Sequence, residues 1–260
     1  MTSTATSSPF GTLQAPAHWQ AVDLISDLHL QVSEPGTFEA WRAHMLGTTA
    51  DAVLLLGDVF EVWVGDDAVQ HDPFLQACAE VLRQTRAQRF VGFMPGNRDF
   101  LVGPAFLNSC GVQALQDPTV LVWGGQRTVL SHGDALCLDD EAYQRFRAMA
   151  RTPDWQAEFL AKPLAERLAM AQAMRAQSEA HNQSMQSFAD ADANMTRDWL
   201  QTANSQHMVH GHTHRPADHA VAGLPGATRQ VLSDWHVNAT QHRAQVLRLH
   251  ADGRRERLPA

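Results

Sequence analysis

Side chains that bind divalent cations recur in five short segments of the sequence. Each segment contains aspartate, asparagine or histidine, and each follows a short apolar run. Carboxylate and amide oxygens with imidazole nitrogens, and without cysteine, suit Mn²⁺, Fe²⁺ or Zn²⁺ in a catalytic site better than a structural zinc site. The five segments are Asp27-Leu28-His29, Gly57-Asp58, Gly96-Asn97-Arg98-Asp99, His132-Gly133-Asp134 and Gly211-His212-Thr213-His214.

None of these segments is specific by itself. An Asp-x-His pair such as Asp27 and His29 more often caps a helix or forms a turn, and Asn97 suits an ordinary turn. A lone histidine is more often packed or exposed than a ligand, but two histidines that alternate beside a glycine, as His212 and His214 do, favour a metal. The five segments together predict two ions, about 3.5–4 Å apart, that clamp a phosphoryl group.

The loop that follows Asp58 carries more acid. Glu61, Asp66 and Asp67 lie within nine residues of it. Because uncompensated carboxylates repel one another at close range, we expect a bound cation to balance this charge. Arg98 adds a guanidinium whose geometry suits phosphate, which indicates an anionic substrate.

Strands must bring these segments to one place. Apolar runs precede them, and helical patterns lie between, as at residues 73–86, where Leu75, Cys78, Ala79 and Leu82 share one face. Alternating strands and helices indicate an α/β fold, in which ligands collect at the carboxyl ends of the strands. The expected strands are residues 21–26, 52–56, 89–94, 206–210, 227–232 and 243–249.

Residues 141–200 lack this strand pattern. Alanine, glutamine, methionine and arginine dominate, and Pro153 and Pro163 divide the region into shorter helices. We therefore expect an inserted helical cap at 141–200, with the core formed by residues 20–140 and 201–260. Residues 1–19 are rich in serine, threonine, alanine and proline, and we expect a disordered extension there.

Composition excludes several classes of protein. A net charge of -8 and a pI near 5.9 argue against a nucleic-acid-binding surface, which is normally basic. No apolar run reaches the roughly 20 residues of a membrane-spanning helix, and the N-terminal residues lack the pattern of a signal peptide. Cys78, Cys110 and Cys137 lack metal-type spacing and are expected to be packed, reduced thiols. We expect the protein in the cytosol.

The five segments, written DxH, GD, GNRD, HGD and GHTH, resemble those of the calcineurin-like metallophosphoesterases over residues 23–249. This resemblance implies a two-sheet sandwich flanked by helices, with Asp58 bridging two metal ions. The ligands that it implies are Asp27, His29 and His214 for one ion and Asn97, His132 and His212 for the other.

Longer stretches, SDLHL, GDVFEVWVGDD, PGNRDF, SHGDALCLDD and HGHTHRP, resemble the UDP-2,3-diacylglucosamine hydrolases of lipid A biosynthesis. The resemblance implies a manganese enzyme, peripheral on the cytoplasmic face of the inner membrane, that cleaves a lipid-linked UDP-sugar into UMP and 2,3-diacylglucosamine 1-phosphate (lipid X). It implies catalytic roles for Arg98, Asp58, Asn97 and His132. The implied substrate contacts are Asn97, Arg98, Asp140, Ser178, Asn182 and His212.

Two positions qualify the match. Met185 stands where the family commonly has a lysine, so Arg175 binds the phosphate instead, or affinity is lower, or the substrate differs. Arg98 stands where many metallophosphoesterases have histidine. Arginine stays protonated and cannot readily act as a general acid, but a phosphate leaving group needs little protonation. Arg98 therefore favours a pyrophosphate bond over a simple alkyl ester.

The cap supplies candidates for lipid recognition. Aromatic residues could line an acyl pocket: Tyr143, Phe146, Trp155 and Phe159. Basic residues could touch anionic headgroups or simply keep a helix soluble: Arg145, Arg147 and Arg151. An apolar stripe on the same cap suits core packing: Leu164, Leu168, Ala171 and Met174.

Two alternatives remain open. One is another dinuclear metallophosphoesterase that acts on nucleotides or phosphoproteins, which a metal-dependent product screen would separate. The other is a non-catalytic metal-binding scaffold with the same fold. The scaffold is disfavoured because every ligand position is filled, whereas degenerate scaffolds usually lose some.

Overall fold

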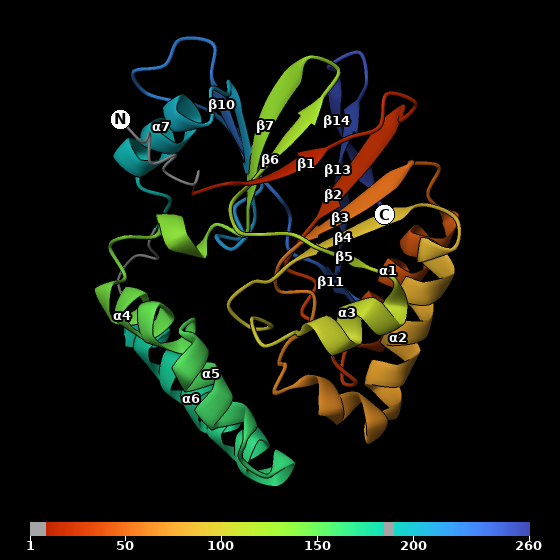
Figure 1. The fold of residues 1–260 in the computed structure, drawn as a ribbon, viewed down its shortest axis with the longest axis vertical. Helices are drawn as coiled ribbons and strands as arrows, with labels where there is room; N and C mark the ends of the chain where they lie inside the picture. The colour runs from red at the N-terminus through yellow and green to blue at the C-terminus, as the bar shows by residue number, and fades with distance from the viewer. Residues whose placement is uncertain (1–8, 185–189) are drawn as a thin grey trace, which may run out of the picture.

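The computed structural model of this chain describes residues 9–184 and 190–260, and two stacked six-stranded sheets form its centre (Figure 1). The first sheet has the order β1 (Gly11–Gln14), β6 (Thr119–Trp123), β7 (Gln126–Ser131), β8 (His207–His210), β10 (Thr228–Val231) and β9 (Ala217–Ala220). The second has the order β14 (Arg255–Pro259), β13 (Gln245–His250), β2 (Ala21–Ile25), β3 (Ala52–Leu56), β4 (Phe90–Met94) and β5 (Gln113–Ala114). A small separate pair is formed by β11 (His236–Val237) and β12 (His242–Arg243).

Helices cover the outer face of each sheet. On the second sheet these are α1 (Pro35–Gly47), α2 (Pro73–Arg86) and α3 (Pro104–Cys110), and on the first sheet α7 (Ala193–Thr202). The resulting order of layers is helix, sheet, sheet, helix. This is the two-sheet sandwich flanked by helices that the resemblance implied.

Side chains along β3 point alternately to the two faces of the second sheet, and both faces are covered. All five residues of β3 are buried. Val53 and Leu55 belong to the cluster shared with α1 to α3, whereas Leu54 and Leu56 belong to the cluster between the two sheets. A strand buried on both faces reads as a continuous apolar run.

The predicted α2 is confirmed at residues 73–86. Asp72 caps it by accepting a hydrogen bond from the backbone N–H of Phe74 at 2.8 Å, and Pro73 occupies its first turn. The apolar stripe faces the second sheet: Leu75, Cys78, Ala79 and Leu82.

Five of the expected strands are confirmed to within one residue at each end: β2, β3, β4, β8 and β10. The last expected run, 243–249, is divided between β12 and β13. Strands β2, β3 and β4 are parallel, and so are β7, β8 and β10. Parallel strands end at one edge, so the five metal-type segments meet at the carboxyl ends of β2, β3, β4, β7 and β8.

The predicted disordered extension is wrong for residues 9–19, in which Phe10 is buried. Gly11–Gln14 forms β1, which pairs in parallel with β6 at the edge of the first sheet. Ala15 and Trp19 are buried, and Trp19 packs in the cluster between the sheets. The prediction failed because the segment is mostly polar and contains only a few apolar residues that pack in the core. The remainder of the predicted extension, residues 1–8, lies outside the described residues.

The region predicted as a cap is helical where the structure describes it, but it divides in two. Three helices lie together beside the sandwich: α4 (Glu141–Ala150), α5 (Pro153–Leu160) and α6 (Leu164–Ser184) (Figure 1). In contrast, α7 packs against the first sheet through Leu200, in a cluster with Val129 and Met208. We use "cap" below for α4 to α6. In the described residues, no helix combines the length and apolarity needed to span a membrane.

The burial of Trp19 generates a test of the N-terminal segment. Its ring packs against Phe90, with ring centroids 5.2 Å apart. Trp19→Ala is expected to lower the free energy of unfolding by about 3–5 kcal/mol, because a large buried side chain is removed from the core. Urea denaturation measures this, with the adjacent exposed residue as the control in His18→Ala. If both variants unfold like the unmodified protein, residues 11–19 are not docked.

Candidate metal centre

Unusual backbone geometry marks the strand ends. Non-glycine residues with positive φ are uncommon, cost of order 1–3 kcal/mol each and concentrate at functional sites. Six occur in the described residues, and only Asn204 lies outside the predicted ligands. The other five are Asp27 (φ 54°), His29 (φ 48°), Asp58 (φ 52°), His212 (φ 66°) and His214 (φ 52°). The fold therefore holds these side chains in place at a conformational cost.

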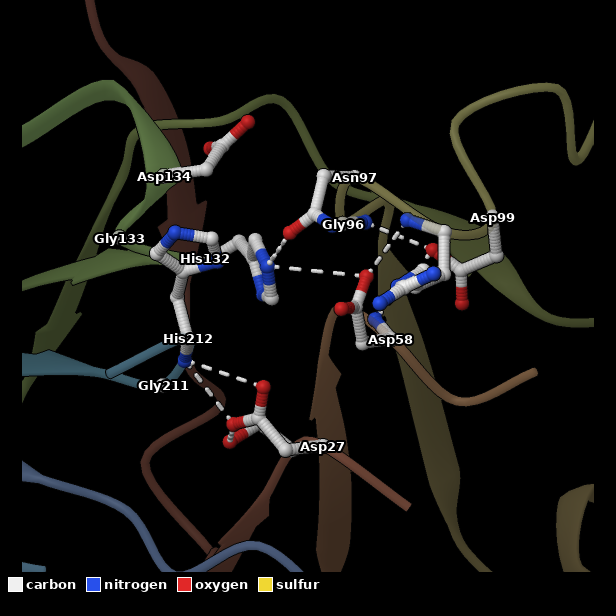
Figure 2. A network of polar contacts seen from close by, with 12 residues as sticks. Asp27, Asp58, Gly96, Asn97, Asp99, His132, Gly133, Asp134, Gly211 and His212 are labelled. Atoms are coloured by element: carbon white, nitrogen blue, oxygen red, sulfur yellow. Dashed lines mark hydrogen bonds and ion pairs between the residues drawn. The ribbon is translucent and has the colours of Figure 1, made fainter. Parts of the chain in front are cut away.

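Asp58 is enclosed by the loop that follows β4. The backbone N–H of Arg98 donates to Asp58 Oδ1 at 2.8 Å. Gly96 lies so close that a Cβ there would be 2.2 Å from the same oxygen, so only glycine fits. Figure 2 shows Asp58 pointing toward His132 and Asn97.

Asp99 ties the loops after β3 and β4 together. Its buried carboxylate accepts hydrogen bonds from the backbone N–H groups of Gly96 and Val59, both at 2.7 Å, and of Asp58 at 3.3 Å. Burial and the neighbouring charge of Asp58 raise the pKa of Asp99 to about 6. Sequence reasoning had not given Asp99 this structural role, although its place in the GNRD segment was the available signal.

Asp27 is fully buried and held by its neighbours. Its side chain accepts hydrogen bonds from Ser26 Oγ at 2.5 Å and from the backbone N–H of His212 at 3.0 Å. A Cβ at Gly211 would be 2.3 Å from Asp27 Oδ2, so this glycine also permits a close approach. Although burial raises it, the nearby imidazoles, first that of His214, hold the pKa of Asp27 below its usual range. Asp27 is therefore an anion in the interior.

One group of donors surrounds Asp27. His29 Nε2 and His214 Nε2 lie 3.4 Å apart, and His214 Nε2 is 3.3 Å from Asp27 Oδ1. Two imidazole nitrogens and an anionic oxygen at these distances are placed to hold a cation. Glu61 Oε2 contacts the other ring nitrogen of His29 at 2.8 Å. Burial alone would lower the pKa of His29, but the carboxylates of Glu61, Asp58 and Asp27 have the larger effect. The pKa of His29 is therefore raised.

A second group surrounds His132. Its Nδ1 lies 3.0 Å from Leu56 O, and since a carbonyl can only accept, Nδ1 carries the proton. The opposite nitrogen, Nε2, is 2.9 Å from Asn97 Oδ1 and 3.6 Å from Asp58 Oδ1 (Figure 2). Burial lowers the pKa of His132, but the carboxylates of Asp58 and Asp27 outweigh it and raise the pKa to about 9. This site stabilises positive charge.

The two groups fit bound metal ions. Donor atoms of Asp27, His29 and His214 all lie within 4.8 Å of one another, and so do those of Asp27, Asp58 and His132. The structure thus places Asp27 in both groups and Asp58 in the second. His212 lies beside them, with its ring centroid 5.1 Å from that of His132. Buried carboxylates and imidazoles without cysteine are suitable ligands for Mn²⁺, Fe²⁺ or Zn²⁺.

The expectation that a bound cation balances the acidic loop is wrong for Asp66 and Asp67. The partners of Glu61 are His29, Arg98 and Arg175. Asp66 accepts hydrogen bonds from the backbone N–H groups of Gly103 at 2.8 Å and Phe106 at 2.9 Å, at the start of α3. Asp67 forms an ion pair with Arg167 on α6. The expected repulsion is therefore relieved at Asp66 and Asp67 by a helix N-terminus and a guanidinium, and not by a metal.

Asp134 anchors the cap instead of binding metal. It accepts hydrogen bonds from Tyr143 Oη at 2.5 Å and Arg147 Nε at 2.8 Å, and Arg151 Nη2 lies 3.5 Å away. The suggestion that Arg147 and Arg151 face lipid headgroups is therefore wrong, because both point toward this buried acid. Arg145 is 72% exposed and pairs with Glu141.

The predicted aromatic residues divide between two places. Tyr143 also stacks on His212, with centroids 6.1 Å apart. Trp155 is central to an aromatic cluster, 5.1 Å from Phe159, 6.1 Å from Phe100 and 6.2 Å from Phe146 between ring centroids. This cluster joins the cap to the residue that follows the GNRD segment.

The remaining predicted substrate contacts lie in or near the cap. Asp140 caps α4, since its side chain accepts a hydrogen bond from the backbone N–H of Tyr143 at 3.0 Å. Met185 and the side chains of Ser178 and Asn182 lie outside the described residues. Arg98 and Arg175 both approach Glu61, at 3.9 Å and 2.8 Å from Oε1.

Comparison with known proteins agrees with this geometry. A profile of the calcineurin-like phosphoesterases matches residues 21–216. The chain is 45% identical over 225 residues to the UDP-2,3-diacylglucosamine hydrolase of Chromobacterium violaceum, covering 83% of this chain and 91% of that protein. It is 43% identical over 248 residues to the hydrolase of that name from Xanthomonas campestris pv. campestris, covering 88% and 95%. The corresponding protein of Bordetella pertussis is 43% identical over 219 residues, covering 82% and 84%. The chain belongs to the calcineurin-like phosphoesterase family, in the branch that contains these UDP-2,3-diacylglucosamine hydrolases.

Proposed function

We propose that this protein hydrolyses the pyrophosphate bond of UDP-2,3-diacylglucosamine in lipid A biosynthesis. Water attacks the α-phosphorus, and the products are UMP and 2,3-diacylglucosamine 1-phosphate (lipid X). The observation that carries the proposal is the convergence of two donor groups, one of which includes Asp58 beside Arg98, in a chain 43–45% identical to hydrolases of that name.

We assign two Mn²⁺ ions as cofactors. Asp27, His29 and His214 would hold one, and Asn97, His132 and His212 the other, with Asp58 shared between them. When bound, the ions would neutralise phosphate charge and activate the attacking water.

The chain's own residues orient this site. His132 donates its Nδ1 proton to Leu56 O, which leaves Nε2 directed toward Asn97 and Asp58. Asp99 fixes the loop that carries Asn97 and Arg98 through three backbone N–H groups. Arg98 remains protonated and stabilises the negative charge that develops on the departing phosphate.

The substrate contacts proposed above extend from the metal centre into the cap. Arg175 on α6 takes the place of the lysine that is absent at Met185, and its guanidinium already lies at Glu61, beside Arg98. The aromatic cluster around Trp155 offers an apolar surface to the acyl chains. Large exposed apolar residues on the cap support peripheral contact with the cytoplasmic face of the inner membrane: Met149, Leu160 and Leu168. The expectation that Leu168 packs in the core is wrong, because it is 40% exposed.

The reaction gives a direct test. Purified protein with Mn²⁺ and UDP-2,3-diacylglucosamine in ¹⁸O-labelled water is expected to release UMP that carries the label, because water attacks the α-phosphorus. Mass spectrometry of both products measures this. Label in the lipid phosphate would place the attack at the β-phosphorus. Cleavage of nucleotides or phosphopeptides, with this substrate untouched, would refute the proposal.

Arg98→Ala is expected to lower kcat by about 10²–10³-fold, because a charge that stabilises the transition state is lost. Arg98→His is not expected to restore the rate, since the leaving phosphate needs no strong proton donor. Steady-state kinetics of UMP release compares the variants. Rescue by histidine would show that proton donation is required, and would remove the reason for preferring a pyrophosphate bond.

Metal content tests the proposed cofactors. Protein loaded with Mn²⁺ is expected to bind two ions per chain, because the donors form two adjacent groups. Elemental analysis counts the ions, and anomalous scattering from loaded crystals locates them. A single tetrahedral zinc, or no retained manganese, would contradict a dinuclear centre.

A further inference from the structure

Glu61 lies where the metal centre meets the cap. Its side chain is 8% exposed, and its backbone N–H donates to Leu30 O at 3.2 Å. Leu30 directly follows the ligand His29, so the backbone holds the two loops together. Neither the ligand assignment nor the proposed substrate contacts give Glu61 a role.

The two carboxylate oxygens of Glu61 contact different functional groups. Oε2 lies 2.8 Å from His29 Nδ1, on the side of the ring away from Asp27 and His214. Oε1 lies 2.8 Å from Arg175 Nη1 and 3.9 Å from Arg98 Nη1. One buried acid therefore contacts a metal ligand, a core arginine and a cap arginine.

Each contact has a physical consequence. A carboxylate at Nδ1 fixes the proton on that nitrogen, leaves Nε2 of His29 free to bind a cation and makes it a stronger donor. A carboxylate oxygen shared by two guanidiniums keeps Arg98 and Arg175 close to each other despite their like charge. An anionic substrate then meets two cations that are already oriented.

We propose that Glu61 is a positioning residue that acts on both the metal and the substrate. Through His29 it strengthens metal binding, and through Arg98 and Arg175 it places the cations that receive the substrate phosphates. The role of Glu61 toward the substrate, the substrate half of this inference, rests on the proposed function. Its role in metal binding, the metal half, can be tested without substrate.

The chain contains a matched control for this proposal. Asp67, in the same loop, forms an ion pair with Arg167 on the same helix, α6. Arg167 is 3% exposed and also donates to Lys162 O at 3.0 Å. No contact of Asp67 reaches a predicted metal ligand among the described residues. Asp67 therefore docks α6 on the core without acting on the metal centre.

The experiment compares Glu61→Gln with Asp67→Asn, each of which removes one charge from this loop. Manganese binding without substrate is measured by electron paramagnetic resonance, stability by thermal unfolding, and KM and kcat by UMP release. Glu61→Gln is expected to weaken binding of one of the two ions about 10–100-fold and to raise KM. Asp67→Asn is expected to lower Tm and to leave manganese affinity unchanged.

Three results would overturn the proposal. These are equal manganese affinity in Glu61→Gln and the unmodified protein, equal loss of affinity in Asp67→Asn, and an unchanged KM in Glu61→Gln. If Glu61→Gln does not fold, Arg175→Ala tests the substrate half at a side chain that is 38% exposed: KM should rise while manganese affinity stays constant, and an unchanged KM would refute it. Failure of the unmodified protein to release UMP refutes the proposed function separately, because manganese binding is measured without substrate.

Discussion

Buried carboxylates at the carboxyl ends of parallel strands impose the main constraint on this structure. Asp27 and Asp58 are at most 2% exposed and lie on backbone with positive φ, so both desolvation and conformation oppose their placement. Imidazoles converge on these two acids, and although burial opposes it, the carboxylate charge raises the pKa of His29 and of His132. A bound cation compensates the same charge more fully, so the geometry that opposes folding favours metal binding.

The charges of the other acids near the site are compensated by protein groups, and this distinguishes these acids from the proposed metal ligands. Asp99 accepts hydrogen bonds from backbone N–H groups, and Asp66 accepts one from a backbone N–H group at the start of α3. Asp134 accepts a hydrogen bond from the guanidinium of Arg147. Each of these carboxylates is neutralised locally by fixed protein groups. In the described residues no guanidinium pairs with Asp27, whose partners are imidazoles, the hydroxyl of Ser26 and the backbone N–H group of His212.

The sequence predicted the centre better than its surroundings. The polar segments and the strands before them were recognisable because most of these strands are short, largely apolar runs that are followed directly by polar residues. The strand β1 was missed, because an edge strand with few apolar anchors among polar residues has no such pattern. The direction of a long side chain could not be predicted either. Arg147 lies on a helix whose pattern suggests exposure, but its partner Asp134 lies 13 residues earlier in the chain, outside that helix. Charge pairs between separate elements become visible only in three dimensions.

These charge pairs connect the cap to the core. Core acids bind cap arginines at three places: Asp134 with Arg147 and Arg151, Asp67 with Arg167, and Glu61 with Arg175. Two of these ion pairs also contact the loops that carry the proposed metal ligands, because Arg151 Nη2 donates to Gly96 O at 2.9 Å and Glu61 contacts His29. Apolar contacts of Phe159 and Leu164 add stability but are less directional. A shift of the cap would therefore disturb the loops that carry the proposed metal ligands, so the proposed lipid contacts and the proposed phosphate chemistry depend on the same ion pairs.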